Sequence, residues 1–532
     1  MTRRLLAFGP REPRQWTCPP LLPLWAALPA AAVAGILMDM AYPDVGWWPA
    51  AFVATGVLLI AAIGRSVMGS LAVGLVFGLV FFSLVVSWTS RYLGPLPWAA
   101  LTIVEGVLTA VWLIPLTLAY RWLPQLIRSD GARLILLPVV VASLWTGREV
   151  MLGAWPYGGF PWARLGMTQS EAPAASLASW VGVSGLSFAM VFAVAVFIEW
   201  VRTRAWRFPV RYVAPLLTVG VLILTPAFST TPAGTMRLGA VQGNGPSGYF
   251  DERAPGAIAS AQSRASTALR GADLDLVVWP EGLDADPFQD GYLAANLTQI
   301  STQLGAPVLA NAATSSGNKL FNTSFLWNPT ISPAPTREQV QTHAKRNPVP
   351  FGEYVPYRGF YAMLAPDLVG LIQREYSPGT DSPVVSVAGI TVGLAICFDV
   401  IYDNVIAESI TSGAEVLVFQ TNNADFRGTD ENLQQLAFAR MRAIETGRAV
   451  VNVSTVGTSQ IIRPDGSTQA SLNAGEAGVL VEQVELRTGA TPGIIVGTSV
   501  SIGAAWGGLA VLMIAGWIAH RRTRLRHKMS PA

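Results

Sequence analysis

Three residues in the second half of the chain could together carry out nucleophilic acyl chemistry. Cys397 directly follows the apolar run 392–396, which predicts a buried strand that ends at the cysteine. A thiol at the end of a rigid strand is well placed to attack, but it needs a base and a group that stabilises the resulting oxyanion. Glu281 and Lys345, both upstream, could supply these two functions.

Each of these residues also has a common structural role. A single cysteine at the end of a strand is more often buried and inert, Glu281 alone could be a surface acid, and Lys345 alone could be a solvated loop lysine. The only other cysteine is Cys18, so neither a disulfide framework nor a cysteine zinc site is expected. The combination of the three residues, in this order, is what indicates a catalytic site.

The composition indicates an integral membrane protein. Of 532 residues, 51% are hydrophobic and only 13% are charged, and the mean hydropathy is +0.41. Eight apolar segments approach or exceed the roughly 20 residues that cross a bilayer: 21–41, 47–64, 66–87, 96–120, 134–152, 179–200, 211–229 and 493–519. Within the fourth of them lies Glu105, for which a structural hydrogen bond is the preferred interpretation.

The basic residues predict the orientation of these segments. Most of them fall on one side of the predicted spans, and the opposite short loops hold few, such as Arg91 and Arg164. Both termini are therefore expected to be cytoplasmic. The sequence predicts a basic N-terminus at 1–20, seven spans within 21–229, an extracytoplasmic domain at 230–492, an eighth span at 493–519 and a basic tail at 520–532.

The segment 230–492 differs from the rest because short apolar strands alternate with helical stretches, which favours one α/β domain. Strands are predicted at 236–242, 274–279, 306–310, 323–327, 391–397, 415–420 and 449–454. Helices are predicted at 257–270, 402–411 and 431–446, and long loops at 329–361 and 376–383.

The flanks of the three reactive residues resemble the nitrilase, or carbon–nitrogen hydrolase, superfamily, whose sites use Glu, Lys and Cys. The resemblance is closer to a membrane branch of it, the apolipoprotein N-acyltransferases. The matching stretches are Trp279-Pro280-Glu281, Lys345 with 348–356 (PVPFGEYVP), 396–399 (ICFD), 241–244 (VQGN), 159–162 (GFPW) and 442–448 (RAIETGR).

This resemblance implies a fold, an activity and a set of roles. The fold would be a polytopic helical membrane bundle with an αββα sandwich in a bacterial cell membrane. The activity would be transfer of a fatty acyl group from a phospholipid, through a Cys397 thioester, to the α-amine of a lipoprotein's diacylglyceryl-cysteine. Glu281 would be the general base and acid, Lys345 and the backbone N–H of Phe398 would stabilise the oxyanion, and Glu353 would support the site. No cofactor, metal or nucleic acid is implied.

The sequence also departs from the family pattern. Phe398 and Asp399 stand where the family usually has tyrosine and glutamate, and Asp425 replaces a tryptophan in a loop that is expected near lipid. The hydrogen bonding behind the cysteine must therefore differ, and donor or acceptor preference is expected to have shifted. Aromatic residues of the loop at 351–361 are expected either to exclude water and dip into the membrane or to pack against the domain.

Two other functions remain open at this point. One is a membrane-tethered amidase or nitrilase, which would release ammonia or a free acid. The other is a scaffold of low activity, because some relatives in this branch work beside, or fused to, a polyprenol-phosphate mannose synthase, which the basic cytoplasmic faces could bind. The intact Glu281, Lys345 and Cys397 argue against pure scaffolding.

Overall fold

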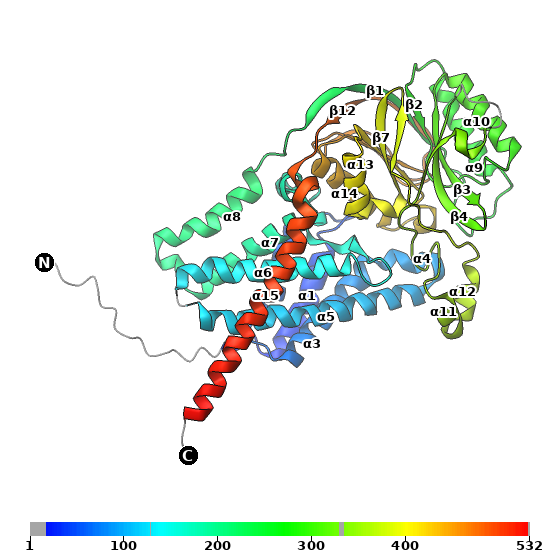
Figure 1. Cartoon of the computed structure of the whole chain (residues 1–532). Coiled ribbons are helices and arrows are strands. Elements are labelled where there is room, and N and C mark those ends of the chain that lie inside the picture. Colours follow the sequence, from blue (N-terminus) through cyan, green and yellow to red (C-terminus); the bar gives the residue numbers. More distant parts are fainter. Residues whose placement is uncertain (1–17, 128, 329–334, 530–532) are drawn as a thin grey trace.

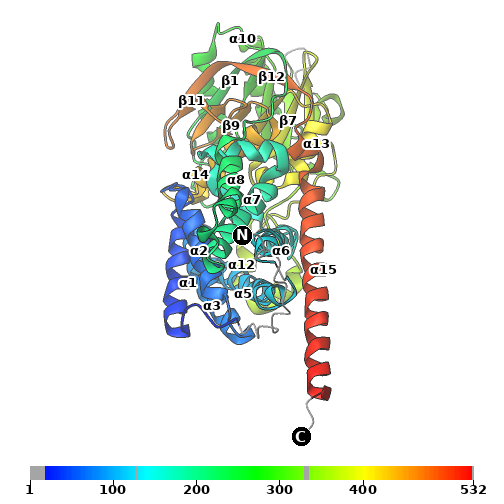
Figure 2. The same ribbon diagram turned by 90° about the vertical axis from the view of Figure 1, so that its left-hand side faces the viewer.

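A bundle of apolar helices and an α/β domain make up the chain in the computed structural model, which describes residues 18–127, 129–328 and 335–529 (Figure 1). The described bundle helices are α1 (Leu24–Asp39), α2 (Pro49–Ala62), α3 (Val67–Val85), α4 (Ser90–Leu93), α5 (Pro95–Leu126), α6 (Asp130–Leu152), α7 (Ala178–Arg202), α8 (Val213–Leu224) and α15 (Pro492–Met529). The α/β domain lies between α8 and α15 in the sequence, and Figure 2 shows α15 and α1 at opposite edges of the bundle.

By length and composition, five described helices could cross a membrane: Val67–Val85, Pro95–Leu126, Asp130–Leu152, Pro173–Arg202 and Pro492–Arg522. The helices in the other three expected spans are shorter than the roughly 20 residues that cross a bilayer. There α1 has 16 residues, α2 has 14 and α8 has 12, because turns and prolines shorten the helix inside each apolar run. Eight spans therefore remain a prediction.

Two sheets form the centre of the α/β domain. The first has the order β12 (Gly478–Thr488), β1 (Thr231–Gln242), β2 (Leu276–Val278), β3 (Val308–Ser316), β4 (Lys319–Trp327) and β5 (Gln341–Ala344). The second has the order β11 (Thr468–Leu472), β10 (Ser459–Ile462), β9 (Val450–Ser454), β8 (Val416–Thr421), β7 (Ile390–Ile396) and β6 (Val384–Val387). The central pairs β1–β2–β3 and β7–β8–β9 are parallel.

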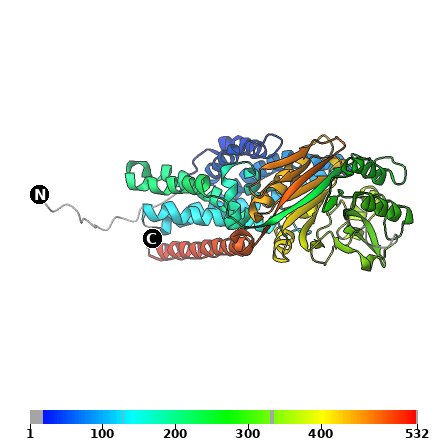
Figure 3. The same ribbon diagram turned by 90° about the horizontal axis from the view of Figure 1, so that it is seen from above.

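Helices cover the outer faces of both sheets, so the expected αββα sandwich is confirmed. The two sheets pack face to face through apolar side chains such as Leu238, Val278, Leu394 and Val418. Helices α9 (Ala257–Ser266) and α10 (Gly291–Leu304) cover the first sheet, and α13 (Asp403–Thr411) and α14 (Glu431–Thr446) lie between the second sheet and the bundle (Figure 1). Figure 3 shows β1 and β12 side by side across the top of the domain, where they pair antiparallel.

All seven expected strands and the three expected helices of this domain are present. The long loop expected at 329–361 is wrong in part: residues 329–334 lie outside the described residues, but β5 and the short helix α11 (Arg358–Leu364) fall within the segment. A second short helix, α12 (Pro366–Leu371), follows directly. These elements escaped prediction because they are only four to seven residues long and carry no clear hydrophobic period.

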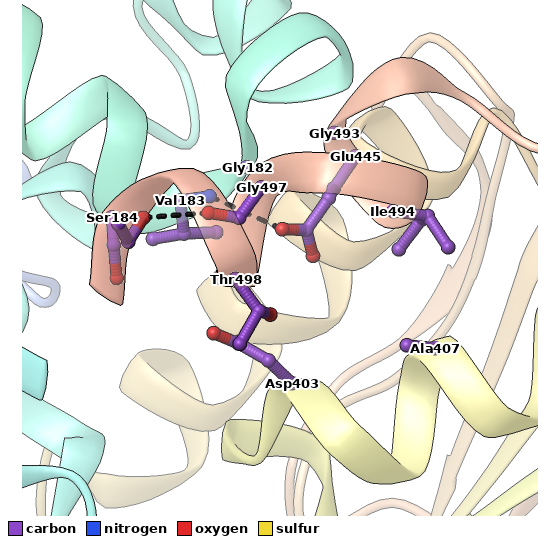
Figure 4. A pocket seen from close by; sticks show the side chains of 11 residues that line it. Gly182, Val183, Ser184, Asp403, Ala407, Glu445, Gly493, Ile494, Gly497 and Thr498 are labelled. Atoms are coloured by element: carbon purple, nitrogen blue, oxygen red, sulfur yellow. Dashed lines mark hydrogen bonds between the residues drawn. The ribbon is translucent and has the colours of Figure 1, made fainter. Parts of the chain in front are cut away.

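The bundle helices α15 and α7 cross closely beside the α/β domain. Gly182 and Gly497 meet there, and a side chain at Gly493 would lie 2.3 Å from the carbonyl oxygen of Ala178. Figure 4 shows these glycines around a void of only about 10 Å³, with Glu445 of α14 accepting a hydrogen bond from the backbone N–H of Val183 at 3.1 Å. The crossing therefore depends on the absence of side chains at the glycines.

Candidate active site

Cys397 lies at a sharp turn between β7 and a short 3-10 helix at Cys397–Ile401. Its φ of 48° is in the left-handed region, which costs a non-glycine residue about 1–3 kcal/mol and persists only where packing enforces it. The neighbouring Ile396 and Phe398 are buried and hold the turn, while Cys397 is half-buried and borders a cavity. This geometry presents the thiol to the cavity on a rigid support.

The other two expected residues follow strands of the first sheet. Glu281 comes three residues after β2, Lys345 directly follows β5, and both side chains are buried. The Lys345 Nζ lies 3.8 Å from the Glu281 Oε1, and the Glu281 carboxyl is within hydrogen-bonding reach of the Cys397 thiol. The structure thus brings together three side chains that are more than 110 positions apart at their extremes in the sequence.

Glu353 completes the constellation, and it combines the two roles that the sequence left open. Its Oε2 lies 2.7 Å from the Lys345 Nζ and also accepts a hydrogen bond from the Val349 backbone N–H at 2.7 Å. Asn322 joins the two acids, because its Nδ2 donates to the Glu281 Oε1 at 2.7 Å and to the Glu353 Oε1 at 3.1 Å. Glu353 therefore both contacts Lys345 and anchors its own loop.

The electrostatics suit a thiol that is deprotonated only during reaction. Burial raises the pKa of Cys397, and the nearby Glu281 adds to this effect. Burial also raises the pKa of Glu281, with Lys345 opposing it, which makes the carboxylate a stronger base than usual. Burial alone would lower the pKa of Lys345, but Glu353 and Glu281 more than offset it and hold the pKa above its ordinary value, so the lysine is a permanent cation.

The two substitutions after the cysteine are explained by their contacts. The Phe398 ring stacks on Phe160 at 6.1 Å between ring centroids, in an apolar cluster where a hydroxyl would need a partner. The Asp399 carboxylate accepts hydrogen bonds from the backbone N–H groups of Arg346 and Asn347 at 3.0 and 2.8 Å. Asp399 therefore ties the turn that follows Lys345 to the turn that carries Cys397.

A cavity of about 560 Å³ runs from Cys397 to the membrane bundle. It is bordered by Glu281, Lys345 and Cys397 of the α/β domain, and also by apolar residues of α5 that are one helical turn apart, Leu96, Ala100 and Val104. The cavity thus connects the polar side chains around the thiol with an apolar stripe on a bundle helix, an arrangement that fits a ligand with a reactive head and a hydrocarbon tail.

Two acidic residues that the sequence singled out also border this cavity. The Asp425 carboxylate accepts a hydrogen bond from the Tyr249 backbone N–H at 2.7 Å, and burial raises its pKa. Glu105 lies on the α5 wall and makes no hydrogen bond to any residue that the structure describes, so the expected structural hydrogen bond is wrong. Its nearest charge partner is Arg148 of α6.

Sequence reasoning missed three polar residues of the site. Asn322 lies within β4, and Gln435 and Glu431 lie one turn apart on the buried face of α14. The Gln435 Nε2 donates to the Cys397 Sγ at 3.5 Å. The sequence could have indicated these residues in one way, because each is a polar side chain at a position where the hydrophobic period of the strand or helix predicts an apolar one. Among the described residues, no group of three or more His, Cys, Asp or Glu side chains could hold a metal ion.

Comparison with known proteins gives two family matches that divide the chain at the same place as the fold. Residues 34–196 match the apolipoprotein N-acyltransferase N-terminal domain, and residues 237–491 match the carbon–nitrogen hydrolase family. The first match covers bundle helices, and the second covers the αββα sandwich with all three reactive residues.

Full-length relatives give the same result. An apolipoprotein N-acyltransferase of Mycolicibacterium smegmatis is 31% identical over 94% of this chain and 88% of its own length. An apolipoprotein N-acyltransferase of Azotobacter vinelandii is 29% identical over 96% of this chain and 98% of its own length. Among solved structures, XC1258 from Xanthomonas campestris, a carbon–nitrogen hydrolase superfamily protein, is 17% identical over 47% of this chain and 91% of its own, with a TM-score of 0.36.

Proposed function

This chain belongs to the apolipoprotein N-acyltransferase family, and we propose that it transfers a fatty acyl group from a membrane phospholipid to the α-amine of an N-terminal diacylglyceryl-cysteine. One observation carries the proposal: Cys397, Glu281 and Lys345 meet at a cavity that is also lined by an apolar stripe on α5. A soluble amidase would not need a reactive site that opens along a bundle helix.

In the first half-reaction, Glu281 removes the proton of the Cys397 thiol and the thiolate attacks the phospholipid ester. The developing oxyanion is stabilised by the Lys345 cation and by the backbone N–H of Phe398. The C–O bond breaks, Glu281 returns the proton to the departing lysophospholipid oxygen, and the acyl group remains on Cys397 as a thioester. The raised pKa of the thiol supports the need for Glu281 as base.

In the second half-reaction, the acceptor amine attacks the thioester at the same oxyanion site. The C–N bond forms and the C–S bond breaks. Glu281 takes a proton from the nitrogen and gives it to the departing thiolate, so the enzyme returns to its starting state. Glu353 and Asn322 keep Lys345 and Glu281 in place throughout, as their contacts of 2.7 Å support.

The contacts between the α/β domain and the bundle support a site at the membrane surface. The Tyr92 hydroxyl, just before α5, donates to the Gly352 carbonyl at 3.1 Å. Helix α11 and the residue before it expose the side chains of Tyr357, Phe360, Met363 and Leu364. We infer that these side chains enter the outer leaflet and that the domain is extracytoplasmic with both termini cytoplasmic, as the basic residues predict.

A polyprenol-phosphate mannose synthase as partner remains a prediction from the resemblance, and affinity purification from membranes tests it. The amidase alternative is tested together with the main proposal. Purified protein in phospholipid vesicles is incubated with a diacylglyceryl-cysteine peptide, and the products are analysed by mass spectrometry. We expect equal amounts of N-acylated peptide and lysophospholipid. Free fatty acid or released ammonia without acylated peptide would make the chain a hydrolase and contradict the transfer.

A further inference from the structure

A second buried carboxyl group lies in the same cavity as the reactive residues. Glu431, the first residue of α14, is 2% exposed and borders the cavity. Its Oε2 accepts a hydrogen bond from the Asn423 Nδ2 at 2.7 Å. Among the residues that the structure describes, its other oxygen has no hydrogen-bond partner, and no cation pairs with the carboxyl group. The Lys345 ammonium group pairs with the carboxyl groups of Glu281 and Glu353 instead.

Hydrogen bonds connect this carboxyl group to the nucleophile. Asn423 also donates to the Gln435 Oε1 at 2.8 Å, and Gln435 in turn donates to the Cys397 Sγ. The Ser454 hydroxyl fixes the orientation of Asn423 by donating to its Oδ1 at 2.6 Å. Glu431 and Gln435 are one turn apart on α14, about 6 Å along its axis, and the Asn423 amide bridges their side chains.

The surroundings leave Glu431 without a compensating charge. Burial raises its pKa to about 8, with the hydrogen bond from Asn423 opposing the shift and the charge of Glu281 adding to it. A buried carboxyl group in this situation is stabilised either by a proton or by an incoming cation. An α-ammonium group has an ordinary pKa of about 7.7–8.0, so a carboxyl group with a raised pKa takes its proton more readily than an ordinary carboxylate would.

We propose that Glu431, held by Asn423 and Gln435, binds the α-ammonium group of the acceptor and takes the proton that this group must lose before it attacks the thioester. The inference rests on the proposed function and adds to it a dedicated subsite for the acceptor amine. It also gives the cavity a means of preferring a cationic nucleophile over water, since water carries no charge that the carboxylate would attract.

The protons balance across the step. The ammonium group gives one proton to the Glu431 carboxylate, and the neutral amine attacks the thioester carbon while Lys345 stabilises the oxyanion. Glu281 removes the second proton from the nitrogen, and the C–S bond breaks as Glu281 passes that proton to the thiolate. Glu431 finally releases its proton to solvent. The products are the amide and the Cys397 thiol, as the overall transfer requires.

The test compares two nucleophiles on the preformed acyl-enzyme. Wild type and Glu431→Gln are loaded with phospholipid, and loss of the acyl group is followed by intact-mass spectrometry with either a diacylglyceryl-cysteine peptide or hydroxylamine, which is uncharged at neutral pH. Removing a proton acceptor costs about 100-fold or more in such steps, so the ratio of the peptide rate to the hydroxylamine rate should fall by that order. Glutamine keeps the size of the side chain and its acceptor for Asn423.

Two further variants keep the test decisive. Glu431→Asp retains a carboxyl group and should recover part of the preference for the peptide, and the exposed Glu252→Gln should behave as wild type. An unchanged ratio in Glu431→Gln, or a Glu431→Gln protein that accepts no acyl group at all, would overturn the subsite. If the wild type itself carries no acyl group, the proposed function fails and the subsite falls with it, so the two failures are distinguishable.

Discussion

At the scale of single residues, the site is organised by how three carboxyl groups are partnered. Glu281 and Glu353 share Lys345 and Asn322, whereas Glu431 has only Asn423. Lys345 opposes the rise that burial causes in the pKa of Glu281, whereas no cation among the described residues does so for Glu431, whose pKa burial raises to about 8. The carboxyl groups that border this one cavity therefore differ in their expected roles, because their neighbours differ.

Asn322 offers a direct test of this partnership. In Asn322→Leu, Glu281 loses a hydrogen bond that lowers its pKa, so the pKa rises further and the base is ionised only at higher pH. The acidic limb of acyl-enzyme formation should shift upward in pH, and the rate at neutral pH should fall about 10-fold or more, because a hydrogen bond to a charged group is worth about 1.5–3 kcal/mol. Rapid-quench mass spectrometry across pH measures this.

The matched control is Asn318→Leu in the exposed turn before β4, which should leave the profile as it is in the wild type. If the acidic limb of the acylation rate lies at the same pH in Asn322→Leu as in the wild type, Glu281 is not the group whose ionisation governs acylation.

The three proposed catalytic residues could be singled out from the sequence, but the polar residues that surround them could not. Cys397, Glu281 and Lys345 stand beside short motifs whose spacing and flanks are distinctive. Asn322, Glu431 and Gln435 lie inside regular elements, where a polar residue ordinarily indicates an exposed face. Only the tertiary structure brings them to the site, where Gln435 contacts the Cys397 sulfur, Asn322 contacts Glu281, and Glu431 borders the same cavity.

At the scale of elements, α5 does more than span the bundle, because its first three turns line the cavity. Glu105 borders the cavity ten residues after the helix begins, about 15 Å along its axis. A carboxyl group is an unfavourable neighbour for methylene groups, so an acyl chain in the cavity should end before it. We therefore expect Glu105→Ala to accept longer chains than the wild type.

This expectation is measured by offering an equimolar set of phospholipids with graded chain lengths and reading the acyl mass on the enzyme. Glu105→Gln keeps the size and polarity of the side chain and should retain the wild-type distribution. An identical distribution in Glu105→Ala would remove Glu105 from the determinants of chain length.

The crossing of α7 and α15 gives a second prediction at this scale. A methyl group in Gly493→Ala would meet the Ala178 carbonyl at 2.3 Å, so the helices must separate, at a cost of about 1–3 kcal/mol. Thermal unfolding in detergent should show a lower Tm. Gly503→Ala, further along α15 with no atom within 4 Å, is the matched control and should not be destabilised. Equal Tm values for the two variants would contradict the close crossing.

The strands and helices with a clear period were predictable, and the short elements were not. β7 and β8 are continuous apolar runs and were expected, as was amphipathic α14. The missed β11 is half-exposed and polar, and it is stabilised by pairing with β10 rather than by its own sequence.

At the scale of the whole molecule, a buried ion cluster joins the α/β domain to the bundle. Asp403 of α13 contacts Arg164, in the segment between α6 and α7, at 2.7 Å, and Arg442 of α14 at 2.8 Å. Burial alone would raise the pKa of Asp403, but the two arginines hold it well below its ordinary value of 3.8. Arg164 and Asp403 lie 239 positions apart, so no local sequence pattern could have predicted the junction.

Removing the charge should loosen this junction. Asp403→Asn leaves two buried arginines undercompensated, at a cost of about 3–5 kcal/mol, and should lower the Tm at neutral pH. A carboxyl group whose pKa is lowered in the folded state stabilises the protein at pH values above its pKa in the unfolded state, and this contribution is lost as the pH falls. The wild type should therefore lose stability below about pH 4. The variant, which has no carboxyl group at position 403, should lack this part of the pH dependence. Asp367→Asn, at an exposed position, is the control. If the wild type and Asp403→Asn lose stability in the same way as the pH falls, the result argues against a stabilising role of this ion cluster.

The central claim is that Cys397 carries the acyl group, and intact-mass spectrometry after incubation with phospholipid tests it most directly. The wild type and Cys18→Ala should each gain the mass of one acyl chain, which is lost when a diacylglyceryl-cysteine peptide is added and becomes N-acylated. Cys397→Ala should gain nothing. If wild type and Cys397→Ala both remain unmodified with several phospholipid donors, or both gain the same mass, the thioester mechanism is wrong.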